Sequence, residues 1–198
     1  MEMIFLRRLA GCCLGGILFF WFLSAGAPDA GIIPATGSAE VFFSPNGGAT
    51  DAIVREIDAA KSEVLVQAYS FTSVPIAQAL LNAKKRGVRI EAVLDKSQRS
   101  ERYTAATFLM NADIAVVIDD RHAIAHNKII IIDRVSLITG SFNFSKNADQ
   151  NNAENLLILK GNKPLMDRYL ANYQAHRDHS VPYEFTPKNR KSGGRALE

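Results

Sequence analysis

A histidine and a lysine stand two residues apart at the start of an apolar run, in His126-Asn127-Lys128 followed by four isoleucines. Positions two apart in an extended strand project to the same face, so the imidazole and the ammonium are expected side by side. A histidine can act there as a nucleophile or as a proton donor beside a fixed positive charge. The isoleucines are expected to anchor this strand in the core and so hold the pair rigidly.

A second polar group follows closely, in Gly140-Ser141-Phe142-Asn143 and then Glu154. Gly140 allows a tight turn, and Ser141 and Asn143 can offer neutral hydrogen-bond donors to one anion. Asp133, directly after the isoleucines, is expected to make a turn or a structural hydrogen bond and is given no chemical step. Together these residue types can place a nucleophile or an acid beside a fixed cation, with neutral donors for one anion.

In order, these residues form the pattern His-x-Lys-x4-Asp-x6-Gly-Ser, which resembles the signature of the phospholipase D superfamily. The segments 140–145 and 152–155 also resemble the small bacterial endonuclease branch that carries a single motif. The resemblance implies a two-step reaction without a metal or another cofactor. One histidine attacks phosphorus, a second protonates the leaving oxygen, and water then cleaves the phosphohistidine.

The resemblance also implies a role for each residue of the site. His126 would be nucleophile and general acid in different copies, and Lys128 and Asn143 would hold the non-bridging oxygens and offset charge in the transition state. Glu154 would accept a hydrogen bond from the second ring nitrogen of His126 and so fix its tautomer. Ser141 would contact the phosphate or the histidine.

A homodimer is expected because a histidine bonded to phosphorus cannot at the same time donate a proton to the leaving group. The other histidines, His122, His176 and His179, do not have a lysine two residues later. A twofold dimer that brings two copies of His126 together is the simplest solution.

No metal ligand set is evident from spacing along the chain. His176 and His179 lie three residues apart and Asp119 and Asp120 form an acidic pair, but no complete set has zinc-like or calcium-like spacing. His122 matches no motif, and a loop role is expected for it.

Composition is compatible with one globular domain, with 47% apolar and 22% charged residues among 198. The formal charge of +3 is too small to identify a nucleic-acid-binding protein. Lys96, Arg99 and Arg102 are candidate substrate-binding residues, either a solvated stripe or a rim that follows phosphates. DNA is the expected substrate, with RNA as a second candidate. A membrane-anchored lipid phosphodiesterase is one alternative, and an inert nucleic-acid-binding module is another.

The first 30 residues are expected to be a signal peptide or an N-terminal membrane anchor. Arg7 and Arg8 precede the apolar segment 14–23, and small residues follow it. Cleavage would make the protein exported, periplasmic or secreted, whereas retention would bring a membrane as partner. The phospholipase D-like domain is expected over residues 36–187, and a disordered basic tail over 188–198.

Apolar runs rich in β-branched residues alternate with amphipathic segments from Ala39 onward, which indicates the α/β class. The resemblance implies a mixed central β-sheet flanked by helices on both faces. Strands are expected at 40–43, 63–69, 88–94, 114–118, 127–132, 136–139 and 155–159, and helices at 50–61, 75–86, 99–110 and 164–176.

Overall fold

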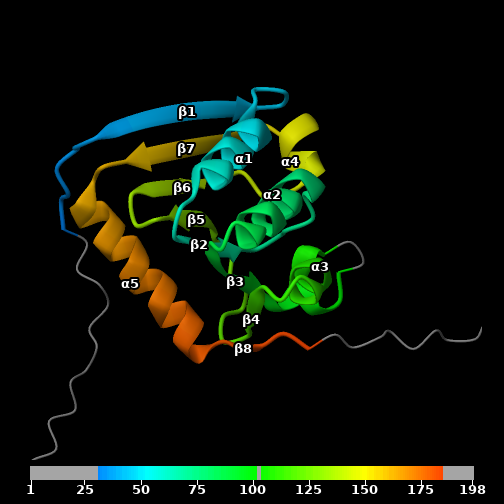
Figure 1. Ribbon diagram of the computed structural model, residues 1–198. Coiled ribbons are helices and arrows are strands. Elements are labelled where there is room, and N and C mark those ends of the chain that lie inside the picture. The colour runs from blue at the N-terminus through cyan, green and yellow to red at the C-terminus, as the bar shows by residue number, and fades with distance from the viewer. Residues whose placement is uncertain (1–30, 102–103, 185–198) are drawn as a thin grey trace, which may run out of the picture. The chain divides into compact units, whose positions relative to one another are not determined.

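A computed structural model describes residues 31–101 and 104–184, and an eight-stranded mixed sheet is its centre. The strand order is β1-β7-β6-β5-β2-β3-β4-β8 (Figure 1). The predicted α/β class and mixed sheet are confirmed. The expected leader and the basic tail lie outside the described residues. The strands are β1 Ser38–Ser44, β2 Glu63–Ala68, β3 Arg89–Asp95, β4 Ala115–Asp119, β5 Lys128–Ile132, β6 Ser136–Gly140, β7 Glu154–Lys160 and β8 Val181–Pro182.

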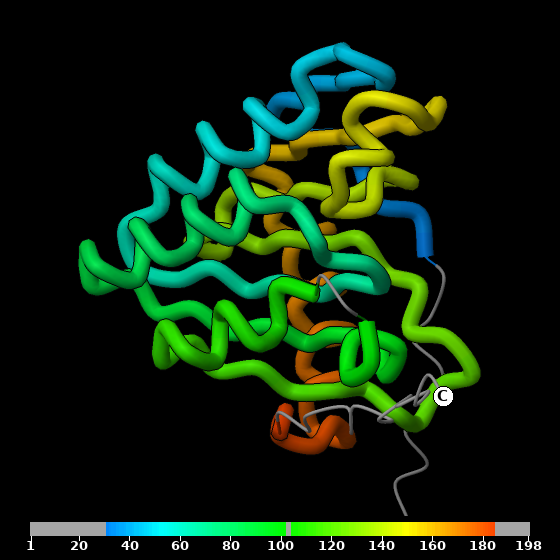
Figure 2. Tube along the Cα trace, turned by 90° about the vertical axis from the view of Figure 1, so that its right-hand side faces the viewer, coloured from blue at the N-terminus to red at the C-terminus, as the bar shows by residue number. Residues whose placement is uncertain are grey.

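Helices cover both faces of the sheet, as predicted. Figure 2 shows α1 to α3 in front of the sheet and α5 behind it. The buried apolar positions of α1 recur at a spacing of three and four residues, which gives the helix one apolar stripe, formed by Ala49, Ala52, Ile53 and Ile57. Among the described helices, none combines the length and the apolar character needed to cross a bilayer. The helices are α1 Ala49–Ala59, α2 Val74–Lys85, α3 Ala105–Asn111, α4 Lys146–Gln150 and α5 Lys163–His179.

Strand β5 is buried on both faces, which explains its unbroken run of isoleucines. Ile130 and Ile132 belong to the core under α1 to α3, whereas Ile129 and Ile131 belong to the core under α5. The strand lies between β2 and β6 and pairs antiparallel with both. A strand held this firmly gives the residues at its start a fixed position.

The helix expected over 99–110 is wrong in its first half. A short 3₁₀ helix, η1 Lys96–Arg99, comes first, and α3 begins only at Ala105. Two separate caps cause the interruption, because Asp95 accepts from the Ser97 amide and Thr104 accepts from the Ala106 amide. Strand β8 and helix α4 were not expected from the sequence.

One edge of the sheet gathers the segments that carry the motif. The carboxyl ends of the parallel strands β2, β3 and β4 lie at this edge, together with the start of the antiparallel β5. The end of β6 and the start of β7 meet there as well, since Gly140 pairs with Leu156. Ligands of α/β proteins bind at such an edge.

Candidate active site

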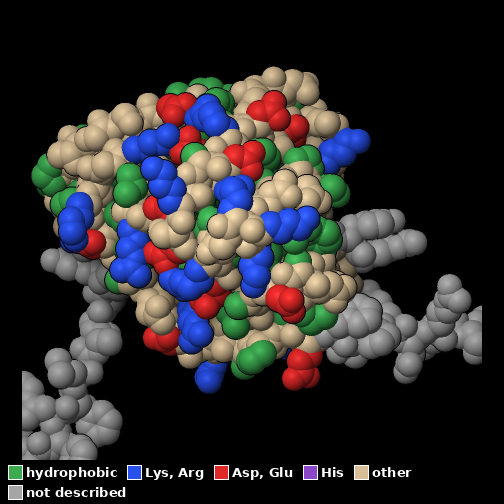
Figure 3. All heavy atoms as spheres, in the orientation of Figure 1, with side chains coloured by type: hydrophobic (Ala, Val, Ile, Leu, Met, Phe, Trp, Pro, Cys, Tyr) green, Lys and Arg blue, Asp and Glu red, His purple; other side chains and the backbone are tan. Residues whose placement is uncertain are grey.

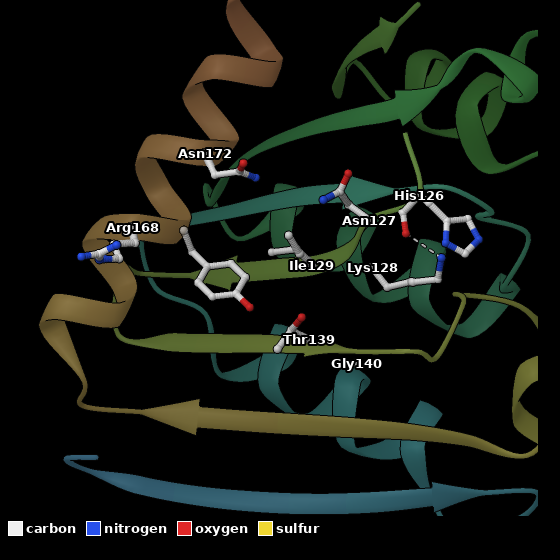
Figure 4. Close-up of a pocket in the computed structure, with 9 residues that line it drawn as sticks. His126, Asn127, Lys128, Ile129, Thr139, Gly140, Arg168 and Asn172 are labelled. Carbon is white, nitrogen blue, oxygen red and sulfur yellow. Dashed lines mark hydrogen bonds between the residues drawn. The ribbon is translucent and has the colours of Figure 1, made fainter. Parts of the chain in front are cut away.

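His126 and Lys128 lie side by side at the start of β5 (Figure 4). The His126 ring is exposed and its centroid lies 4.6 Å from that of Tyr69, with the planes tilted by 52°. Lys128 is only 7% exposed; its Nζ donates to the His126 carbonyl oxygen over 2.7 Å and lies 5.1 Å from the centre of the Tyr69 ring. An accessible imidazole therefore stands beside a fixed cation.

Burial determines the electrostatics of Lys128. Loss of solvent lowers the pKa of this ammonium, the negative charge of Glu154 raises it, and the net direction is down. An ammonium has three donors, and only one of them is used on the His126 carbonyl oxygen. The remaining donors suit the non-bridging oxygens of a phosphate.

The segment after β6 is fixed by its backbone. The amide of Ser141 donates to the Asn155 carbonyl oxygen over 3.0 Å, and the Ser141 Oγ accepts from the Asn155 amide over 3.0 Å. Gly140 has φ 150°, and a Cβ there would overlap the Asn155 carbonyl oxygen. This position therefore requires glycine, and the following residues enter the site at a set angle.

Asn143 and Glu154 lie at the same edge of the sheet but have different partners. Asn143 is half-buried, and its Oδ1 has no hydrogen-bond partner within the described part of the chain. A carboxamide of this kind is suited to meet a group from outside the chain. Glu154 Oε1 accepts from Asn152 Nδ2 over 3.1 Å, and no hydrogen bond joins it to the His126 ring among residues 31–101 and 104–184. Its expected bond to His126 stays a prediction.

Two residues near the histidine were missed by the sequence reasoning. Asp95, at the end of β3 and 2% exposed, accepts from the Ala125 amide over 2.7 Å through Oδ2. Ala125 directly precedes His126, so this carboxylate positions the segment that carries the histidine. Tyr69 supplies the ring that contacts both His126 and Lys128. An acidic residue at the end of a buried strand was the only signal for Asp95.

A cavity of about 350 Å³ extends from His126 across the sheet toward α5 (Figure 4). Its size is typical of small-molecule sites. Most of the side chains around it are polar, with amide, hydroxyl and guanidinium groups. Its walls are formed by His126, Asn127, Lys128, Ile129, Thr139, Gly140, Arg168, Tyr169 and Asn172.

Asp133 makes several hydrogen bonds at the start of β2. Its carboxylate accepts from the amides of Lys61, Ser62 and Glu63 and from the Ser62 hydroxyl, over 2.7 to 2.9 Å. Burial raises the pKa of this carboxyl group, but the hydrogen bonds lower the pKa by more, so the net direction is down. Asp133 lies at the other end of β5 from Lys128 and fixes the start of β2.

The candidate substrate-binding cations contact the loop between β4 and β5. Lys96 Nζ donates to the His122 carbonyl oxygen over 2.9 Å, and Arg99 pairs with Asp120 over 3.2 Å. Arg102 lies outside the described residues. On the face shown in Figure 3, basic side chains are interspersed with acidic ones. A role for these residues in substrate binding stays a prediction.

A second cluster of titratable residues lies where β4 ends. Ring nitrogens of His122, His176 and His179 converge on the buried carboxylate of Asp119, and the four groups lie within 4.8 Å of one another. Burial would raise the pKa of Asp119, but the contacts with His176, His122 and His179 lower it below its usual range. Spacing along the chain did not reveal this group, because its two halves are 57 residues apart.

The comparisons with known proteins agree with this fold. A family model described as cardiolipin synthase, PLD-like domain, matches residues 53–177. The chain therefore belongs to the phospholipase D superfamily and has the phosphodiesterase fold of that family.

Solved structures and curated relatives support this assignment. The structure of Nuc from Salmonella typhimurium, a phospholipase D family member, is 35% identical with a TM-score of 0.72, covering 75% of this chain and 99% of that one. NucT from Helicobacter pylori, at 24% identity and a TM-score of 0.70, shares the fold over 75% of this chain and 100% of that one.

Among curated relatives, a phospholipase D of Rickettsia prowazekii is 40% identical over 143 residues, which are 72% of this chain and 69% of that protein. The human mitochondrial cardiolipin hydrolase is 29% identical over 152 residues, 75% of this chain and 60% of that protein. The matched region of a further relative, the phospholipase D of Rickettsia felis, is 65% of that protein.

Proposed function

We propose that this protein is a metal-independent endonuclease that hydrolyses DNA, with RNA as a second candidate substrate, through a phosphohistidine in a homodimeric active site. The observation that carries the proposal is the exposed imidazole of His126 beside the buried ammonium of Lys128. This arrangement supports the proposal, because an accessible imidazole can attack phosphorus while a neighbouring ammonium binds the non-bridging oxygens.

In the first step a ring nitrogen of His126 forms a bond to phosphorus while the bond from phosphorus to the leaving oxygen breaks. His126 of the partner subunit gives its proton to that oxygen. In the second step His126 of the partner subunit takes a proton from water. The oxygen of this water attacks phosphorus and releases the first histidine. Lys128 and Asn143 stabilise the charge on the non-bridging oxygens in both steps, and Glu154 orients the imidazole.

The arrangement of the other histidines supports the need for a second copy. His122, His176 and His179 all face Asp119, so none of these three is available as the proton donor. Excess His126→Asn protein, co-refolded with wild type, is then expected to reduce activity beyond simple dilution, because mixed dimers have one functional histidine. A monomer by light scattering that retains full activity would refute the shared site.

The polar walls of the cavity support a nucleic-acid substrate. Asn127, Thr139 and Asn172 offer hydrogen bonds to sugar and phosphate groups, and such contacts carry little base preference. The test compares plasmid DNA, RNA, and phosphatidylcholine or cardiolipin vesicles, with His126→Asn as the control. Plasmid nicking that depends on His126 and continues in excess EDTA is expected. Complete inhibition by EDTA of protein whose circular dichroism spectrum and melting temperature are both unchanged would contradict the metal-independent chemistry.

The alternative of a lipid phosphodiesterase is favoured by two observations. Relatives of the chain carry the names phospholipase D and mitochondrial cardiolipin hydrolase. Ile124 is 58% exposed only two residues before His126, where an apolar side chain could enter a lipid surface. On this alternative, Ile124→Ser lowers vesicle hydrolysis and leaves plasmid nicking unchanged. The intact His126–Lys128 pair argues against an inert binding module.

A further inference from the structure

Four residues with metal-binding side chains meet where the last turn of α5 contacts the end of β4. Asp119 is the last residue of β4 and His122 follows it in the loop, while His176 and His179 lie one turn apart on α5. Two short pairs from distant segments are thus brought together. Strand β8, which follows α5, pairs with β4 next to them.

The atoms that face one another are all potential ligands. His176 Nδ1 lies 2.6 Å and His122 Nδ1 2.9 Å from Asp119 Oδ2, and His179 Nε2 lies 3.2 Å from Asp119 Oδ1. The ring centroids of the three histidines are 4.7 to 5.4 Å apart. Tetrahedral zinc, with bonds of about 2.0–2.2 Å, requires ligand atoms roughly 3.4 Å apart, a separation between the 2.6 Å contact of His176 with Asp119 and the 4.8 Å within which all four ligand atoms lie.

Hydrogen bonds alone do not satisfy the cluster. Asp119 is fully buried, and its two oxygens face three imidazole nitrogens and the amide of Arg121. His179 Nε2 is buried, and despite its short distance to the carboxylate it lacks the geometry of a hydrogen bond. Buried polar atoms in native proteins have partners. One cation bound to all three nitrogens and the carboxylate would supply the missing partner.

We propose that Asp119, His122, His176 and His179 bind one divalent transition-metal ion, of which zinc is the best match. Three neutral imidazoles and one carboxylate form a set of nitrogen and oxygen ligands that zinc accepts in tetrahedral geometry. Four protein ligands leave no position open for substrate, which is typical of a structural site. The inference stands apart from the proposed nuclease activity, since it assigns no chemical step to the metal.

The position of the site indicates what the metal would stabilise. The ion would tie the end of α5 to β4, and it would fix the loop that runs from His122 to His126. Lys96 already holds this loop through the His122 carbonyl oxygen, and Asp95 holds it through the Ala125 amide. Metal loss is therefore expected to loosen the C-terminal helix and this loop together.

The experiment uses the full chain, stripped with chelator, dialysed, and titrated with Zn²⁺ or with Co²⁺ as a spectroscopic probe. One equivalent per chain, a raised melting temperature and the visible absorption of four-coordinate Co²⁺ are expected. His122→Ala is the main variant, because this exposed loop side chain contributes little to folding. Loss of the His122 ligand should weaken Zn²⁺ binding by at least roughly 10–100-fold, because loss of a residue that only hydrogen-bonds to a metal ligand already weakens metal binding by that much.

His179→Ala tests the α5 half of the site, and His126→Asn is the matched control that removes a histidine outside it. The proposal is supported if the two cluster variants lose the ion while His126→Asn keeps it. It is overturned if wild type binds no stoichiometric Zn²⁺, if both cluster variants bind as tightly as wild type, or if His126→Asn alone loses the ion. Because the readout is binding, a failure of the nuclease proposal leaves this result unaffected.

Discussion

Replacement of Asp133 by asparagine is expected to lower the stability of the fold without changing the chemistry, although Asp133 belongs to the motif. Asp133 Oδ1 accepts from Ser62 N, Ser62 Oγ and Glu63 N, and Oδ2 accepts from Lys61 N. Asparagine keeps one oxygen but turns an NH₂ group toward an amide donor. Because Asp133 has φ 51°, which asparagine also tolerates, the backbone is a small source of difference. We expect a loss of about 2 kcal/mol in the free energy of unfolding, from charge-assisted bonds that become unpaired or neutral.

The assay is urea and thermal unfolding of both proteins at several pH values, with plasmid nicking measured on folded protein. A loss of this size corresponds to a fall in Tm of roughly 4–8 °C. The pKa of Asp133 is lowered in the fold, so its stabilisation is present above the unfolded pKa of about 3.9 and is lost as pH falls through the folded value. The difference between the two proteins should therefore be full at neutral pH and shrink in acid.

The same variant should retain the turnover rate of wild type below its melting range. Asp133 and Lys128 stand at opposite ends of β5, roughly 17 Å apart along a strand of this length. A variant of unchanged stability with strongly reduced turnover would refute the structural role. A stability difference that does not vary between neutral pH and pH 3 would refute the contribution of the charge.

Three further outcomes test the site. Activity should fall at alkaline pH, at a pH below the ordinary lysine pKa, because Lys128 loses its proton as pH rises through its lowered pKa. Glu154→Gln should move this alkaline fall in activity to lower pH, because it removes the negative charge that raises the pKa of Lys128. An unchanged pH profile would exclude an electrostatic effect of Glu154 on Lys128. Gly140→Ala should lower the free energy of unfolding, measured in urea, by at least about 2 kcal/mol, because its φ is positive and a Cβ there would overlap the backbone. A urea midpoint equal to that of wild type would show that this overlap is relieved. Asp95→Asn should reduce kcat about tenfold with little change in KM, since it positions His126; an unchanged kcat would remove Asp95 from that role.

Local pattern predicted the part of the site that lies at the start of one strand. Strand β5 begins at Lys128, and His126 lies beside Lys128 in the extended segment that leads into it, while the isoleucines predict the central position of the strand. Gly140 was predicted as a turn residue, although the close approach of Asn155 that makes it necessary depends on the pairing of β6 with β7.

Contacts between distant strands could not be predicted in the same way. Asp95 reaches Ala125 because the end of β3 lies at the same edge as the segment leading into β5, which follows from strand order rather than from sequence spacing. Asp119 meets His176 for a similar reason, since α5 returns across the sheet to β4. The helix expected over 99–110 failed because Thr104 supports a new helix start.

The covalent step of the proposed reaction can be tested most directly by trapping it. A short oligonucleotide labelled at the scissile phosphorus is mixed with enzyme and quenched during turnover under alkaline conditions that preserve phosphoramidates. We predict that the label is recovered on the peptide containing His126, in wild type but not in His126→Asn. Label on another residue, or steady turnover without any labelled protein, would contradict the mechanism.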